Sequence, residues 1–96
     1  MLIITSKDDF KRGFTVEGHA QFDVEGKDIV CSAISALTQV FTMGLREYGR
    51  TFSTSQKGYM DVLIEEPNRD TVILTNTLKK GLEAVEQAFP EYVKIT

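Results

Sequence analysis

The feature that most constrains the fold is a run of apolar residues at three- and four-residue spacing between positions 30 and 48. At about 100° per residue, this spacing places an apolar face along one side of a helix. The face consists of Val30, Ala33, Ile34, Leu37, Phe41, Gly44, Leu45 and Tyr48. Asp28 is a preferred N-cap residue. The sequence therefore predicts a helix that begins at Ile29 and ends before Gly49.

Period-two alternation and turn residues predict the other elements. We expect strands over residues 2–4, 14–19, 51–56 and 59–65, with a hairpin turn at Lys57-Gly58 and a short final strand within residues 92–95. A second helix is expected from an N-cap at Asp70 to Pro90, which cannot continue it. The predicted order is β-β-α-β-β-α, with a possible terminal β. The simplest architecture is an α+β sandwich, a mostly antiparallel sheet with two helices packed on it.

Composition narrows the class of protein. Ninety-six residues, of which 42% are hydrophobic, suit a single globular domain over 1–96. The apolar runs are shorter than the roughly 20 residues that span a bilayer, and the N-terminus lacks the features of a secretory signal. A net charge of −3 offers no basic surface for nucleic acid. We therefore expect a soluble cytoplasmic protein that binds neither membrane nor nucleic acid.

The one histidine and the one cysteine, His19 and Cys31, lie within the same fourteen-residue stretch. A single cysteine cannot form an internal disulfide, and this pair cannot complete a four-ligand zinc site. No cofactor and no metal are expected, although a metal shared by two chains stays open.

The placement of these two residues favours nucleophilic chemistry. Thiolate formation is favoured in the first turn of a helix and beside an imidazolium. At the predicted end of a strand, His19 could deprotonate Cys31 and later protonate a leaving amine. Free N–H groups of the first helical turn could stabilise an oxyanion. By helix phase, Cys31, Ser35, Thr38 and Thr42 form a polar stripe about 100° from the apolar face, so the thiol is predicted on the flank of the helix.

Each of these residues also has a purely structural interpretation. A free cysteine is often a small buried hydrophobe. Asp28 can be a helix cap or a charge partner of His19, and Ser35 can face the same site or bond back to its own helix. Gly18 and Gly26 can be turn residues, or can let the 20–27 connection move over the site as a lid.

The run GHAQFDVEGKDIVCSAISALTQ resembles the ribosomal-processing cysteine protease family, Prp. The family signature is Gly-His-Ala, a short gap, Gly-x-Asp-Ile-Val-Cys and a helix of small residues. The segments GLEAVEQ and FPEYVKIT are also similar, so the resemblance covers nearly the whole chain. Ser32 and Ile34 stand where the family often has alanine and valine.

The resemblance implies a cytoplasmic endopeptidase that removes the N-terminal extension of a large-subunit ribosomal protein, the twenty-seventh, during ribosome assembly. It implies Cys31 as nucleophile and His19 as general base, with Asp28 and Ser35 in supporting positions near the site. It also implies a homodimer, and a mobile loop over residues 20–27 that contains Gly26 and follows Gly18. Two other functions stay open: a non-catalytic ribosome-associated binding module, and a redox sensor built on the thiol.

Overall fold

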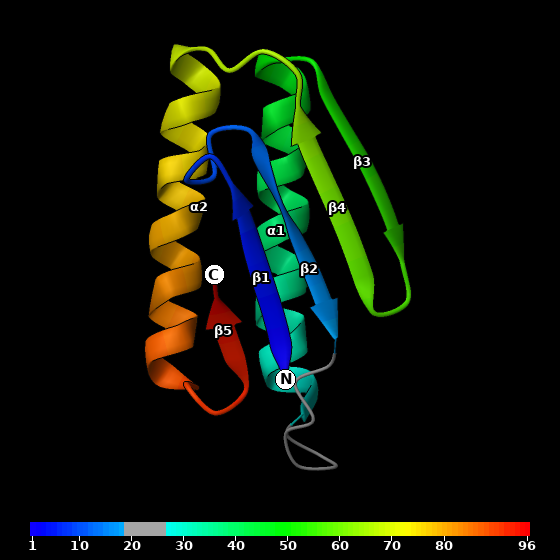
Figure 1. Ribbon diagram of the computed structural model, residues 1–96, viewed down its shortest axis with the longest axis vertical. Coiled ribbons are helices and arrows are strands. Elements are labelled where there is room, and N and C mark those ends of the chain that lie inside the picture. The colour runs from blue at the N-terminus through cyan, green and yellow to red at the C-terminus, as the bar shows by residue number, and fades with distance from the viewer. Residues whose placement is uncertain (19–26) are drawn as a thin grey trace.

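The computed structural model describes residues 1–18 and 27–96, with the side chains of the second part described from Ile29 onward (Figure 1). Its elements are β1 (Leu2–Lys7), β2 (Gly13–Gly18), α1 (Lys27–Tyr48), β3 (Thr51–Gln56), β4 (Tyr59–Ile64), α2 (Arg69–Ala88) and β5 (Val93–Ile95). The strands form one sheet in the order β3-β4-β2-β1-β5, in which only the β1–β5 pair is parallel. Figure 1 shows α1 and α2 side by side on one face of this sheet. The predicted α+β class and element order are confirmed.

The strand register aligns the apolar side chains on the face that carries the helices. Ile4 of β1 lies opposite Val16 of β2, and Phe14 of β2 lies opposite Val62 of β4. Because side chains alternate between the two faces of a strand, these pairs place one continuous apolar layer beneath α1 and α2. The buried apolar residues of the core are Leu2, Ile4, Phe10, Phe14, Val16, Val30, Ile34, Leu45, Val62, Ile64, Leu78, Leu82 and Val93.

Helix α1 has two packing faces where the sequence predicted one. Towards α2 the two helices come close at their glycines, because a Cβ at Gly44 would lie 3.4 Å from Leu74 and a Cβ at Gly81 would lie 3.7 Å from Leu37. A second side of α1 is buried through Thr38 and Thr42. Their hydroxyls donate to the carbonyls of Ile34 and Thr38, at 2.8 and 2.6 Å. Helix phase placed these threonines on a separate stripe outside the apolar face, and the structure buries that part of the stripe, since their hydroxyls are satisfied within the helix.

Both helices begin earlier than predicted. Helix α1 begins at Lys27, so Asp28 is its second residue and not its N-cap. Helix α2 begins at Arg69 with Asn68 as its N-cap, where the sequence favoured Asp70. The Asn68 side chain accepts from the Thr71 backbone N–H at 3.0 Å, and the Thr71 hydroxyl accepts from the Asn68 backbone N–H at 2.8 Å. This reciprocal capping box gives the backbone N–H groups of Asn68 and Thr71 one acceptor each. Asp70 lies inside the first turn and cannot serve as the N-cap.

By length and composition alone, residues Ile29–Tyr48 of α1 could cross a membrane, with a mean hydropathy of 1.4. The expectation that no apolar segment reaches that length is therefore wrong. This helix supplies Val30, Ile34 and Leu45 to the core, and this packing accounts for its apolar composition.

The turn between β1 and β2 holds three consecutive non-glycine residues at positive φ. Asp8, Asp9 and Phe10 have φ values of 52°, 51° and 70°. Such a conformation costs free energy for residues with a Cβ. The Phe10 side chain is buried, with its ring centroid 6.2 Å from that of Phe14, and Asp9 forms an ion pair with Lys79 of α2 at 2.8 Å. The burial of Phe10 therefore offsets the strain of the turn.

Replacing Phe10 tests this anchoring. Phe10→Ala should lower the free energy of unfolding by about 3–5 kcal/mol, because removing a buried aromatic ring leaves a cavity. Urea unfolding followed by circular dichroism measures the change. The control is Asp8→Gly in the same turn, which should change stability by less than about 1 kcal/mol because glycine adopts positive φ freely. Equal effects of the two substitutions would contradict the anchoring role.

The Asp9–Lys79 ion pair gives a pH-dependent contribution to stability. The hydrogen bond, and then the charge of the partner, lower the pKa of Asp9 below 3.8 and raise the pKa of Lys79 above 10.5. The Asp9 contribution is present above pH 3.8 and is lost as the pH falls through its lowered pKa, whereas the Lys79 contribution is present below pH 10.5 and is lost as the pH rises through its raised pKa. The difference in urea midpoint between the unmodified protein and Lys79→Met should therefore be largest between these limits. A difference in urea midpoint that does not change with pH would show that the effect of Lys79→Met comes from packing of the side chain and not from the ion pair.

Candidate active site

An open groove of about 190 Å³ lies beside the first turns of α1, next to the end of β2 and the β3–β4 hairpin. Its described lining residues are Leu2, Val16, Gly18, Cys31, Ile34, Ser35, Thr38, Gln39, Ser55, Gln56, Gly58, Tyr59 and Met60. None of these side chains is charged. The groove therefore suits a neutral, extended chain segment better than a strongly charged ligand.

Cys31 opens onto this groove from α1. It is a free cysteine with a half-buried side chain that packs partly against the core. Because α1 begins at Lys27, Cys31 is its fifth residue and not its third, so the Cys31 backbone N–H is not one of the free N–H groups of the first turn. The Cα–Cβ bond of a helical residue tilts towards the helix N-terminus, and this directs the thiol back towards the positive end of the helix dipole. The predicted flank position of the thiol is confirmed.

Ser35 lies one turn after Cys31 on the same side of α1 and lines the groove with it. Its hydroxyl oxygen accepts a hydrogen bond of 2.8 Å from Nε2 of Gln39, a further turn along. The structure therefore brings Cys31 and Ser35 together. Gln39 was missed, although its four-residue step from Ser35 continues the spacing from Cys31 to Ser35.

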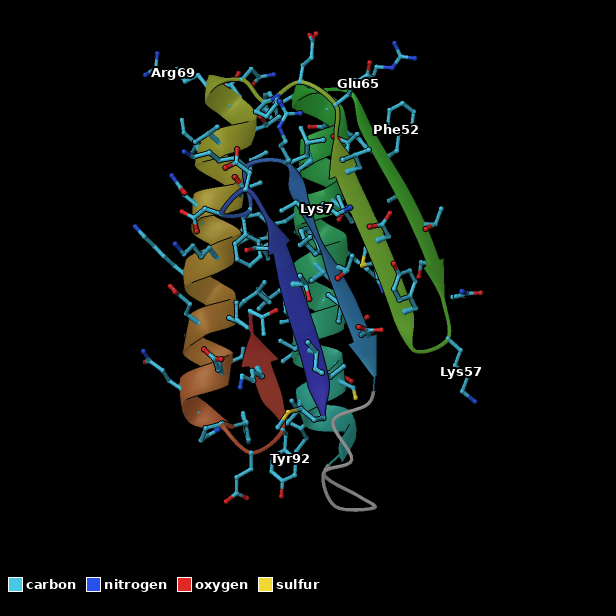
Figure 2. All side chains as sticks on the ribbon, viewed as in Figure 1. Lys7, Phe52, Lys57, Glu65, Arg69 and Tyr92 are labelled. Atoms are coloured by element: carbon cyan, nitrogen blue, oxygen red, sulfur yellow. The ribbon has the colours of Figure 1, made fainter. Side chains whose placement is uncertain are left out.

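The β3–β4 hairpin forms the opposite wall of the groove. Ser55 and Gln56 come from the end of β3, and Tyr59 and Met60 come from the start of β4. Figure 2 shows Lys57 at the hairpin tip pointing away from the molecule. The sequence predicted this hairpin but not its position beside Cys31, because nothing in a local pattern reports which distant element packs beside a helix.

The remaining predicted site residues are only partly covered by the structure. His19 and Gly26 lie outside the described residues, as does most of the predicted loop over residues 20–27. The backbone of Asp28 is helical, and its side chain is not described. Gly18 ends β2 at φ +96° and lines the groove. The Cys31–His19 pairing therefore stays a prediction.

Within residues 1–18 and 27–96, no three side chains of His, Cys, Asp or Glu gather closely enough to hold a metal ion. The expectation of a metal-free and cofactor-free site stays a prediction, since His19 lies outside this part of the chain.

A half-buried free thiol that opens on a groove whose described lining is uncharged defines a candidate nucleophile, as found in thiol hydrolases. The model of a family described as "Cysteine protease Prp" matches residues 1–94. The chain therefore belongs to the cysteine protease Prp family, and it is a cysteine protease. No curated protein sequence matches it.

Solved structures share the fold at low sequence identity. The ribosomal processing protease Prp from S. aureus, in complex with a covalently linked product peptide, has a TM-score of 0.82 and 21% identity, over 99% of this chain and 95% of that one. The same protease with a substrate peptide has a TM-score of 0.80, 21% identity and the same coverage. SMU.848 from Streptococcus mutans also has a TM-score of 0.80 and 21% identity, over 100% of this chain and 92% of that one.

Gly18 is the point at which a side chain would disturb the end of β2. A Cβ there would lie 2.4 Å from the Met1 carbonyl oxygen, at a φ of +96°. Gly18→Ala should therefore lower the free energy of unfolding by about 1–2 kcal/mol or more. Gly81→Ala is the matched control: its Cβ meets Leu37 at an ordinary 3.7 Å, and alanine should stabilise the helix interior by about 0.5–1 kcal/mol. Urea midpoints that shift in the same direction for both variants would contradict this interpretation.

Proposed function

We propose that this cysteine protease removes the N-terminal extension of a large-subunit ribosomal protein, the twenty-seventh, during ribosome assembly in its host. The observation that carries the proposal is the open groove onto which Cys31 faces, whose described lining residues carry no charge. Family membership supports it, and so do the solved structures of similar fold, which are described as ribosomal processing proteases with bound peptides.

In the proposed mechanism, His19 takes the proton of the Cys31 thiol, and the sulfur bonds to the carbonyl carbon of the scissile peptide. Collapse of the tetrahedral intermediate breaks the C–N bond while His19 protonates the leaving amine, which becomes the new N-terminus of the ribosomal protein. A water molecule, deprotonated by His19, then hydrolyses the thioester and releases the extension as a free acid. Asp28 and Ser35 support this pair from the same region of the chain.

The floor of the groove favours an apolar substrate segment. Leu2, Val16 and Ile34 are buried core residues that line it, and Met60 is packed against the same core. Burying an apolar substrate side chain here is favourable at roughly 25 cal/mol per Å² of apolar surface removed from water. This supports an apolar extension as the substrate.

We further propose that the enzyme is a cytoplasmic homodimer and that the loop predicted over residues 20–27, of which the structure assigns Lys27 to α1, gates the site. Exposed apolar side chains on α1 support association. Ile29, Val40 and Met43 are each more than half exposed, at 59%, 62% and 62%. A net charge of −3 supports a function without direct nucleic-acid binding.

Substitution of the proposed pair tests the function. Incubation with the host's ribosomal protein that carries its extension should yield the shortened product, read by intact mass. Cys31→Ala should abolish cleavage, and His19→Ala should lower kcat by at least about 10³-fold with little change in substrate binding. The control is Ser32→Ala, which should cleave like the unmodified protein because Ser32 is exposed and does not line the groove.

The same experiment separates the alternatives. Cleavage at an unchanged rate by Cys31→Ala would overturn the assignment of the nucleophile. Binding of the ribosomal protein without cleavage, together with a Cys31 thiol that does not react with iodoacetamide at neutral pH, would support the non-catalytic binding module. Peroxide reactivity of the thiol that persists in His19→Ala would support the redox sensor.

A further inference from the structure

The hydroxyl of Ser35 is used differently from the other hydroxyls on its side of α1. Thr38 and Thr42 donate to carbonyls of their own helix. The Ser35 hydroxyl instead accepts from Gln39 Nε2 at 2.8 Å. Across residues 1–18 and 27–96, no hydrogen bond has the Ser35 hydroxyl as its donor.

A hydroxyl group has one hydrogen to donate and two lone pairs to accept. Because the Gln39 amide occupies a lone pair of the Ser35 oxygen, the hydrogen of that hydroxyl stays available to a partner. Both side chains line the groove with Cys31, and side chains four residues apart on a helix have Cβ atoms about 5–6 Å apart. Cys31, Ser35 and Gln39 therefore form one line along the groove wall, with the donor next to the thiol.

We propose that Gln39 is a positioning residue that holds the Ser35 hydroxyl as a hydrogen-bond donor towards the groove, where it binds a main-chain carbonyl oxygen of the peptide substrate. This inference rests on the proposed protease function, because it assigns a peptide to the groove. An extended peptide presents a carbonyl oxygen to the same side at every second residue, about 6.6 Å apart along the chain. A carbonyl close to the scissile bond is thus within reach of a donor one turn from Cys31.

The alternative state of Ser35 explains why a partner such as Gln39 is needed. Helical serines readily donate to the carbonyl four residues earlier, which for Ser35 is the carbonyl of Cys31. Without Gln39, the Ser35 hydroxyl donates to the Cys31 carbonyl of its own helix and no longer offers its hydrogen to a ligand in the groove. A glutamate at position 39 goes further, because a carboxylate only accepts and so draws the Ser35 hydrogen towards itself.

The test compares Gln39→Glu, Gln39→Met and the unmodified protein in two measurements. The probe is the host's ribosomal protein with its extension. Its Kd is measured by calorimetry in the Cys31→Ala background, and KM and kcat are measured in the active background. Loss of one neutral hydrogen bond should raise Kd and KM by about five- to tenfold, with the larger effect in Gln39→Glu and with kcat unchanged within about twofold.

Three controls make the outcome specific to the Ser35 hydroxyl. In a Ser35→Ala background, Gln39→Glu should have no further effect on Kd. The alkylation rate of Cys31 by iodoacetamide should stay unchanged in Gln39→Met, because this substitution removes the amide without bringing a charge near the thiol. Gln87→Glu, the same change at an exposed position of α2 outside the groove, should behave like the unmodified protein.

The outcomes separate this inference from the proposed function. If the unmodified protein neither binds nor cleaves the probe, the proposed function fails. If it binds and cleaves, and Gln39→Glu and Gln39→Met match it in Kd and KM, the positioning role of Gln39 is overturned. If Gln39→Glu weakens binding equally with and without the Ser35 hydroxyl, the effect comes from charge and the inference is also overturned.

Discussion

The double packing of α1 is the constraint on which the rest of the structure depends. One side of this helix meets α2 at glycine positions, where the helices approach closely, and another side, with Val30, Ile34 and Thr38, is buried in the core. A helix held on two sides cannot rotate about its axis without breaking one of these contacts. The direction in which Cys31 points is therefore fixed by residues up to several turns away from it.

The sequence predicted most of the architecture, because the elements carry local signals. Alternation predicted the strands, and the Lys57-Gly58 turn predicted the hairpin with the observed bounds of β3. The helix starts were less accurate. Asp70 and Asn68 are both good capping types, and only the reciprocal bond with Thr71 decides between them. The burial of Thr38 was also missed, since a buried threonine that bonds to its own helix has the same sequence signature as an exposed one.

Within the described residues, the sequence predicted the helical side of the candidate site and Gly18 at the end of β2. Cys31 and Ser35 share a helix face by simple periodicity, and the structure places both in one groove. The opposite wall, from Ser55 to Met60, depends on how the β3–β4 hairpin, more than twenty positions after Cys31 in the sequence, packs beside the first turns of α1. Gln39 belongs to the same periodic line as Cys31 and Ser35, but an exposed glutamine on a helix is so common that its spacing alone did not single it out.

The parallel pairing of β1 with β5 has a consequence for when the groove can form. The Leu2 backbone N–H donates to the Tyr92 carbonyl at 2.8 Å, and the Leu2 side chain lines the groove that holds Cys31. Contacts between such distant residues close a long loop and form only once both segments are free to meet. During synthesis, the β5 residues must leave the ribosome before β1, already adjacent to β2 in the sheet order, gains its second partner. Leu2, which lines the groove, is then held by a strand on each side only after translation of β5, so that an incomplete chain carries the thiol beside a groove wall with one strand fewer to support it.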